Sequence, residues 1–441
     1  MNRVARVALF FSASCVLALP LFASVARRLL SRPATLFALA AFAVVEPLLY
    51  FANELKPYGV DVCFALLILR AALGALERPV STARGLAYAV GGALVVWISY
   101  PAVFGLAAVG LVLAARAVRR HDLRALGRTI AVAGAWGLSF LALYALTAAR
   151  AASSAYLRDF WRHARAPLPT SSKALSWYVT TFFEVFHDPA GFLQPALAAA
   201  AALVGIVAVG RRSCAVLGLL VVPVVLALLA SNLVGYPFAS RLILFLVPSV
   251  LLLVAAGLDE LRRIPGRPIW FGVAAAVLLF QPAVAAVSQA RHPRGREELR
   301  PVLAGLATRV RPGDAVYVYE YGHPQFDWYT RHGLALPVGT RIIRAAATPD
   351  AVEPGESSKR FTSAVSLRET LAPTVGRPEF ARVWALFTHV ITWKGVDEEA
   401  VARAEFLRAG YVVDAAASAG LSAPGASATL FVRPDAEVPP R

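Results

Sequence analysis

The chain has 441 residues, of which 58% are hydrophobic and 16% charged, and its mean hydropathy is +0.61. This balance excludes a soluble globular protein and indicates a membrane protein. The net charge is +17, but the basic residues are dispersed over short loops without a recognised nucleic-acid-binding motif, so no nucleic-acid partner is expected. The three cysteines, Cys15, Cys63 and Cys214, have no metal-binding spacing.

Long apolar runs fill the first 290 residues. A helix needs about 20 predominantly apolar residues to cross a bilayer. On that criterion the sequence predicts a polytopic α-helical membrane protein with about ten transmembrane helices. The two runs that flank Pro101 are the least regular, because both are short. The predicted spans are residues 4–25, 33–52, 58–76, 84–99, 101–116, 126–148, 191–210, 213–231, 241–258 and 267–289.

Charge divides the chain into two parts. Residues 1–290 contain 25 lysines and arginines against 10 acids, whereas residues 291–441 contain 19 against 17. The arginines of the first part gather in alternate loops, which the positive-inside rule places in the cytoplasm. The remaining connections are then extracytoplasmic: residues 53–57, 149–190, 232–240 and 290–441.

The source that the composition favours is a bacterium. All but four of the 44 basic residues are arginine, and alanine is abundant, which is typical of a G+C-rich genome. A chain of this kind with many spans is expected in the bacterial plasma (inner) membrane. Its neighbours there are membrane lipids, and the sequence does not indicate an oligomeric state.

The last 151 residues, 291–441, are expected to form a separate extracytoplasmic α/β domain. Strand patterns alternate with helical ones, which predicts a mostly parallel sheet. No glycine-rich phosphate loop opens a helix after any strand, so dinucleotide binding is not expected. The predicted strands are residues 315–319, 383–387, 411–415 and 428–432, the predicted helices are 297–310, 325–332 and 396–409, and residues 345–360 are expected to be a loop.

A charged turn between two spans is the strongest functional signal. Glu54 and Lys56 lie between the runs 33–52 and 58–76, and Tyr58 begins the second run. Ionisable residues at such positions are costly and are therefore functional candidates. Asp61 lies one turn further on, near the same face as Glu54. The alternative is that Glu54 and Lys56 only pair with each other or with phospholipids, and that Tyr58 is an interfacial tyrosine.

The connection 149–190 is long and rich in aromatic residues interleaved with Arg158, Arg162 and Arg165. One interpretation is an interfacial amphipathic helix with its aromatic side chains at the headgroups. The other is the wall of a substrate cavity that offers cations to a lipid phosphate. Glu184, His187 and Asp188 allow a metal site by spacing, although the pattern is more typical of a solvated loop end.

Four stretches, in order, resemble a known family. The segment 49–61, LYFANELKPYGVD, resembles the YxxE(L/A)(K/R)PY segment of bacterial membrane glycosyltransferases of the C-type fold, which are related to protein O-mannosyltransferases and are often called family 39-like. The segment 235–242, GYPFASRL, is similar to their external YPFxxR turn. Residues 297–319 and 382–389 resemble the first and second strand regions of their tail domain.

The resemblance implies transfer of a sugar from a polyprenyl-phosphate donor to an extracytoplasmic acceptor. Such a reaction needs a carboxylate as general base. It also needs positive charge on the leaving phosphate, from a side chain or a divalent metal ion. Glu54 and Asp61 are the candidate catalytic acids, with Glu54 also a candidate metal ligand, and Lys56, Tyr58 and Arg241 are the candidates for binding the donor phosphate.

Two further functions remain open. The first is a non-catalytic membrane protein of the same fold, which binds a glycan or a lipid without turning it over. The second is a transporter, which is disfavoured because no paired repeats with broken spans are evident.

The beginning of the chain departs from this family. Its members carry their principal acids in a first external loop after an initial span, whereas no acid precedes Glu46 here. With ten spans and an external tail the N-terminus would be external too, yet Arg3 and Arg6 favour the cytoplasm. Both observations lead us to expect that a span and an acidic loop are missing upstream of Met1.

Translation of the DNA upstream of Met1 tests this expectation. An open frame that encodes a span and an Asp-containing loop is the expected result, and it would support the enzyme. An in-frame stop codon close to Met1 would contradict it and favour the binding protein.

Overall fold

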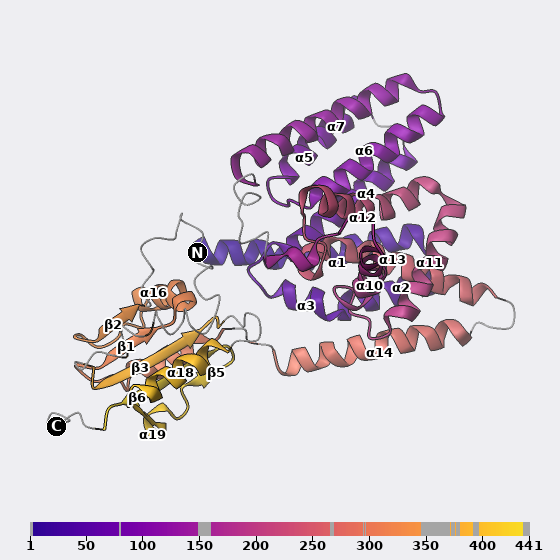
Figure 1. Cartoon of the computed structure of the whole chain (residues 1–441). Helices are drawn as coiled ribbons and strands as arrows, with labels where there is room; N and C mark the ends of the chain where they lie inside the picture. Colours follow the sequence, from indigo (N-terminus) through magenta and orange to yellow (C-terminus); the bar gives the residue numbers. More distant parts are fainter. Residues whose placement is uncertain are drawn as a thin grey trace. The chain divides into compact units, whose positions relative to one another are not determined.

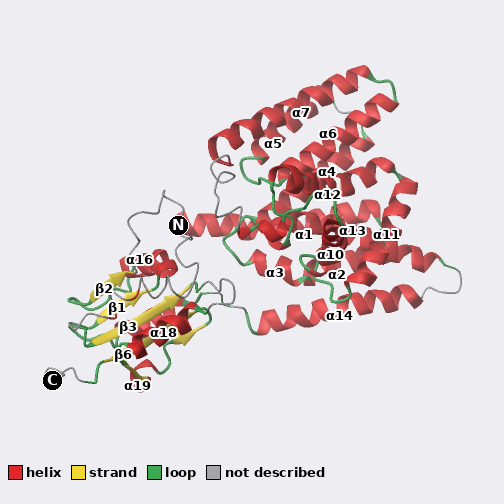
Figure 2. Cartoon of the chain, in the orientation of Figure 1, coloured by secondary structure: helices red, strands yellow, loops and turns green. Residues whose placement is uncertain are grey.

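The computed structural model describes residues 3–78, 81–148, 160–264, 269–293, 295, 297–344, 371, 375, 380–390 and 397–434. The chain divides into two compact units, Met1–His292 and Pro293–Arg441 (Figure 1). Within the described residues the first unit is helical and the strands belong to the second unit (Figure 2).

Helices of very different length build the first unit. Several of them begin at a serine or aspartate whose side chain accepts a hydrogen bond from the first turn, as at Ser81, Asp122, Ser171 and Ser213. The helices are α1 (Arg3–Leu29), α2 (Arg32–Val44), α3 (Glu46–Ala52), α4 (Tyr58–Glu77), α5 (Thr82–Val95), α6 (Ala102–Arg119), α7 (Leu123–Leu143), the π-helix η1 (Tyr144–Ala148), the 3-10 helix η2 (Arg162–Ala164), α10 (Ser172–His187), α11 (Pro195–Arg212), α12 (Cys214–Val234), the 3-10 helix η3 (Ser240–Leu246), α13 (Val247–Arg263) and α14 (Ile269–Arg291).

Eight helical segments of the described chain are long and apolar enough to cross a membrane, and α2 with α3 makes a ninth if the bent pair is one span. The pair bends by 50° at Val45, whose extended backbone separates the two helices just before Pro47. The expected span 84–99 is α5, which has only 14 residues and does not meet the criterion. The prediction of about ten spans is therefore confirmed only in part.

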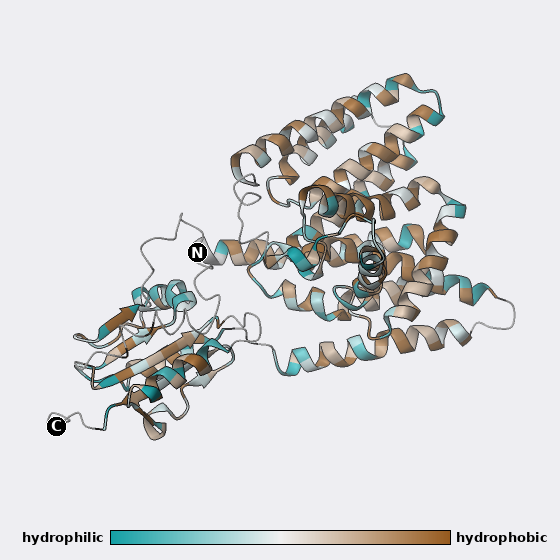
Figure 3. Ribbon diagram, in the orientation of Figure 1, coloured by the Kyte–Doolittle hydropathy of each residue, from teal (hydrophilic) through white to brown (hydrophobic). Residues whose placement is uncertain are grey.

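The helices of the first unit are rich in hydrophobic residues, which colour long stretches of their ribbons brown (Figure 3). Large apolar side chains lie exposed on its outer helices, with Phe280 72%, Leu138 71% and Leu233 75% exposed. Such side chains need an apolar surrounding, because water would leave this area unfavourably hydrated. Together with the apolar helices, they indicate a multi-pass membrane protein.

Helix α13 is the buried centre of the first unit. Of the most apolar window in Ser240–Arg263, 94% is buried. Helix α11 approaches α13 so closely that a Cβ atom on Gly205 would collide with the Leu253 carbonyl oxygen, and one on Gly257 with the Ala201 carbonyl oxygen. Small residues permit this contact between helix backbones, as in other membrane proteins.

The second unit is a mixed sheet flanked by short helices. Its sheet has the order β2-β1-β3-β6-β4, with β5 paired to β6. The strands are β1 (Ala315–Val318), β2 (Arg341–Arg344), β3 (Arg382–Thr388), β4 (Val412–Asp414), β5 (Ser422–Ala423) and β6 (Ala426–Val432). The helices are α15 (Leu299–Ala307), the 3-10 helix η4 (Glu320–Gly322), α16 (His323–Arg331), α18 (Glu398–Arg408) and α19 (Ala415–Ser418).

The sheet is parallel on one side and antiparallel on the other. Strand β1 pairs in parallel with β2 and β3, whereas β6 pairs antiparallel with β3 and β4. The expected mostly parallel sheet is therefore correct for β1–β3 only. Only the four-residue helix α19 and the two-residue strand β5 lie between β4 and β6. A connection this short joins antiparallel neighbours, whereas parallel strands need a longer crossover. The expected loop 345–360 lies outside the described residues.

A buried carboxylate fixes the ends of β1 and β3. Asp314 accepts hydrogen bonds from Arg382 Nε at 2.8 Å, from Trp384 Nε1 at 3.0 Å and from the Arg311 backbone N–H at 3.0 Å. These bonds offset the desolvation of the charge, because every donor points at the carboxylate. They hold the turn before β1 against the neighbouring strand.

The close approach of α11 and α13 gives a stability prediction. The substitution Gly257→Ala places a methyl group against the Ala201 carbonyl and should lower the free energy of unfolding by about 1–3 kcal/mol through overpacking. Gly272→Ala on α14 is the matched control, since a Cβ atom there meets nothing within 4 Å. Titration with SDS of the purified chain in detergent micelles measures both. Equal stability of the two variants would contradict the packing described here.

Candidate functional site

The charged turn predicted from the sequence connects α3 to α4. Lys56 is exposed, Glu54 is half-buried with its Oε2 shielded from solvent, and Tyr58 begins α4. Asp61, in the first turn of α4, is only 7% exposed. Within the described residues, Asp61 Oδ1 has no hydrogen-bond partner. A buried carboxylate oxygen without a partner is costly, which marks Asp61 as a functional position.

Arg241 lies between two aromatic rings at the same end of the unit. Its guanidinium carbon is 5.9 Å from the centre of the Tyr58 ring and 5.5 Å from that of Trp161. Cation–π attraction holds a guanidinium in such a position without neutralising its charge. Arg241 Nε is buried, and it has no hydrogen-bond partner among the residues that the structure describes. The two rings therefore fix the orientation of the Arg241 guanidinium, while its Nε–H has no acceptor within the described residues.

The backbone before Arg241 is strained. Ser240 has a φ of 44°, which is uncommon for a residue with a Cβ atom. Conformations of this kind cost free energy and concentrate at functional sites. The 3-10 helix η3 begins at Ser240 and leads directly into the buried helix α13, so the position of Arg241 depends on the most buried helix of the unit.

Hydrogen bonds fasten the segment around Trp161 to the end of α12. The Phe238 N–H donates to the Ala164 carbonyl at 2.8 Å, and the Ala166 N–H donates to Ser231 Oγ at 2.9 Å. Tyr178 of α10 donates to the Pro167 carbonyl at 2.7 Å. These contacts position Trp161 next to Arg241. The Tyr178 hydrogen bond also joins α10 to this segment.

Tyr236 lies near Asp61 and Tyr58. Its hydroxyl donates to the Leu242 carbonyl at 2.6 Å, and its ring packs edge-on against Phe104 at 5.2 Å. Burial, followed by the nearby negative charges of Asp61 and Tyr58, raises the pKa of Tyr236 well above its usual range. The phenol therefore stays neutral at physiological pH and remains a hydrogen-bond donor.

A second arginine lies beside this cluster. The guanidinium of Arg165 packs directly on Gly235, where a Cβ atom would lie 3.0 Å from its Cζ. Gly235 has a φ of 74° and ends α12, so glycine is required both by the backbone and by the arginine. Arg165 Nε is buried and lacks a hydrogen-bond partner within the described residues. Within the described residues, two arginines with an unsatisfied Nε–H thus lie at the segment 235–241: Arg165 packs on its first residue and Arg241 is its last.

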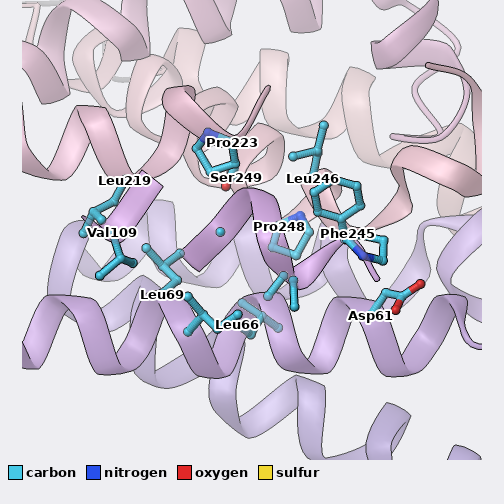
Figure 4. Close-up of a pocket in the computed structure, with 15 residues that line it drawn as sticks. Asp61, Leu66, Leu69, Val109, Leu219, Pro223, Phe245, Leu246, Pro248 and Ser249 are labelled. Atoms are coloured by element: carbon cyan, nitrogen blue, oxygen red, sulfur yellow. The ribbon is translucent and has the colours of Figure 1, made fainter. Parts of the chain in front are cut away.

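Asp61 borders a small cavity of about 30 Å³ inside the helices. Figure 4 shows Asp61 at one end of this cavity, with Leu66 and Leu69 of the same helix along one wall and Phe245 and Pro248 across from them. Such a volume holds one or two water molecules. Sites for small organic ligands enclose about 300–1,000 Å³. A sugar therefore does not fit beside Asp61 in this conformation.

The residues present do not fit a metal centre. Across the described ranges, no three side chains of His, Cys, Asp or Glu come close enough to hold an ion. Glu184, His187 and Asp188 do not form such a group, and the metal role of Glu54 stays a prediction.

Of the five predicted residues, the structure brings Tyr58 and Arg241 together. It places Asp61 one turn further along α4, and Glu54 and Lys56 in the adjoining turn. Sequence reasoning did not single out Tyr236 or Ser99. Tyr236 belongs to the segment 235–242 that drew attention to Arg241. Ser99 is 1% exposed and is the polar neighbour of the Asp61 side chain. In the sequence, Ser99 is recognisable only as a single hydroxyl residue between two apolar runs, two positions before Pro101.

Comparison of the chain with models of known protein families found no match. Comparison with curated proteins found none either.

Proposed function

We propose that the chain is a membrane glycosyltransferase that moves a sugar from a polyprenyl-phosphate donor to an extracytoplasmic acceptor. The observation that carries this proposal is Arg241, held between Tyr58 and Trp161 with a buried, unsatisfied Nε, on the side of the unit where the Asp61 carboxylate is also buried. A cation and a carboxylate at one end of an apolar bundle match a donor with a lipid tail and a phosphate. The resemblance of segments 49–61 and 235–242 to C-type-fold enzymes supports the same proposal.

The two groups have complementary roles in the transfer. The acceptor hydroxyl oxygen forms a bond to C1 of the sugar while the bond from C1 to the phosphate oxygen breaks. Asp61 takes the hydroxyl proton as general base. Arg241 stabilises the negative charge that develops on the leaving phosphate, and Tyr58 orients the guanidinium.

The turn before α4 supplies further groups. Lys56 is exposed at the membrane surface and attracts the donor phosphate. Glu54 is half-buried next to it and is the second candidate acid. Arg165, which packs on Gly235, adds one of the cations that the second interpretation of the connection 149–190 offers to a lipid phosphate. In this proposal the site and the second unit lie outside the cytoplasm of a bacterial cell, as the arginine-rich loops of the opposite ends suggest.

The alternative is a non-catalytic protein that binds a glycan or lipid headgroup. The small volume of the cavity at Asp61 favours it, since a transferase must open this cavity to admit an acceptor. Binding without turnover would need only the arginines. The two functions therefore differ in their need for Asp61: sugar transfer requires its carboxylate as general base, and binding does not.

The test is sugar transfer by the full-length protein in proteoliposomes that contain polyprenyl-phosphate sugars. Asp61→Asn should lower the transfer rate by about a hundredfold or more, because it removes the general base. Glu54→Gln should also abolish transfer if Glu54 is the second acid. Arg241→Gln should weaken donor binding as well as the rate.

The matched control is Glu184→Gln, an exposed acid on α10 that the proposal does not use. It should transfer sugar at the unsubstituted rate. If no form of the protein transfers sugar, and Asp61→Asn still binds the donor, the enzyme proposal is wrong. The non-catalytic binding protein would then be the supported function. Unchanged transfer by Asp61→Asn or by Glu54→Gln would remove that acid from the mechanism.

A further inference from the structure

A second and much larger cavity lies among α4, α5, α6 and α7, which Figure 1 labels in the first unit. Its volume is about 730 Å³, within the range of small-molecule sites. Its walls are mostly apolar along their length, with Leu67, Leu86, Leu113 and Trp136 among the lining side chains. The proposed transfer reaction does not use it.

Close contacts between α5 and α7 border one part of the cavity. Gly92 lies directly under Trp136, where a Cβ atom would collide with the indole, and Trp136 Nε1 donates to the Tyr88 carbonyl at 2.9 Å. Further along, Ser139 Oγ donates to the Ala93 carbonyl at 2.7 Å. These contacts close the inner end of the cavity, and Gly91, where a Cβ atom would meet nothing within 4 Å, faces open space.

Basic side chains surround the other end. Arg78, Arg116, Arg120 and Arg128 line the cavity together with the acids Glu77 and Asp122. Both acids already have partners: Glu77 forms an ion pair with Arg28 at 3.1 Å, and Asp122 accepts the Ala125 N–H at 2.9 Å as the cap of α7. In the described chain, Arg116 and Arg120 form no ion pair with an acid. The arginines at this end form the rim of the cavity, and the positive charge of the rim is suited to binding an anion.

The dimensions match one leaflet of a bilayer. Along α4 the lining runs from Leu67 to Arg78, which is roughly 16 Å at the rise of an α-helix. Half of the hydrocarbon core of a bilayer measures about 15 Å. An acyl chain with its headgroup at the arginines would reach the inner end at Trp136. A polyprenyl chain is much longer and would extend beyond it.

The rim is also far from the candidate functional site. Asp61 and Glu77 lie at opposite ends of α4, roughly 24 Å apart along its axis. A phosphate at Arg116 and Arg120 is thus in the opposite leaflet from one at Arg241. The arginine-rich rim belongs to the side that the positive-inside rule assigns to the cytoplasm, where anionic phospholipids attract basic residues.

We propose that this cavity binds an anionic glycerophospholipid, with an acyl chain between α4–α7 and the phosphate headgroup on Arg116 and Arg120. The bound lipid fills the space that α5 leaves open and joins α5 to α6. The proposal does not depend on the transfer reaction.

Native mass spectrometry of the delipidated full-length protein tests the proposal, with phosphatidylglycerol and phosphatidylcholine of identical acyl chains as probes. The tightest binding event should favour phosphatidylglycerol. The double variant Arg116→Gln/Arg120→Gln should weaken it by about fivefold for each arginine. Arg119→Gln is the matched control, because Arg119 is exposed on the same helix and does not line the cavity.

A second pair of variants tests the apolar part. Gly91→Phe should fill the cavity and abolish retention of the lipid, whereas Gly137→Phe, on an open part of α7 that does not line the cavity, should not. Equal retention of both lipids, or undiminished phosphatidylglycerol binding by the double variant and by Gly91→Phe, would overturn the proposal. Polyprenyl phosphate that binds more tightly than phosphatidylglycerol and is lost in the same variants would overturn the assignment to a phospholipid.

Discussion

The contact of α11 with α13 through Gly205 and Gly257 is the constraint on which the rest of the first unit depends. Two helix backbones meet there without intervening side chains. Most of α13, up to Asp259, is buried. In an apolar solvent the hydrophobic effect adds little between helices, so this close packing supplies much of their association. A helix fixed in this way gives a rigid base to the segment that precedes it.

That segment carries Arg241. The strained Ser240 and the 3-10 helix η3 continue directly into α13, while Tyr58 and Trp161 hold the guanidinium from α4 and from the connection before α10. Three parts of the chain that are distant in sequence therefore converge on one cation. The cavity beside Asp61 is narrow. In this conformation two aromatic rings hold the Arg241 guanidinium in position, and the Asp61 carboxylate is shielded from solvent.

Much of this could be predicted from the sequence, for identifiable reasons. Apolar runs of sufficient length set most of the helices. The cost of charge near the membrane singled out Glu54 and Asp61, whereas Arg241 was singled out by the resemblance of segment 235–242. The 50° bend at Val45 was not predicted, because apolar composition is the same on both sides of a break. The run 84–99 was recognised as short, and α5 is shorter still. Ser99 and Tyr236 acquire their significance only from tertiary packing. The antiparallel pairing of β6 depends on the short connection from β4, and strand β2, Arg-Ile-Ile-Arg, is too short and too charged at its ends to be recognised.

The central claim is that Arg241 receives the phosphate of a lipid-linked sugar. Its most direct test is an electron cryo-microscopy structure of the full-length protein in lipid nanodiscs with polyprenyl phosphate. The account predicts phosphate density within hydrogen-bond distance of the Arg241 guanidinium, with the Tyr58 and Trp161 rings still in contact with it. Phosphate density only at Arg116 and Arg120, with Arg241 in contact with protein groups alone, would contradict it.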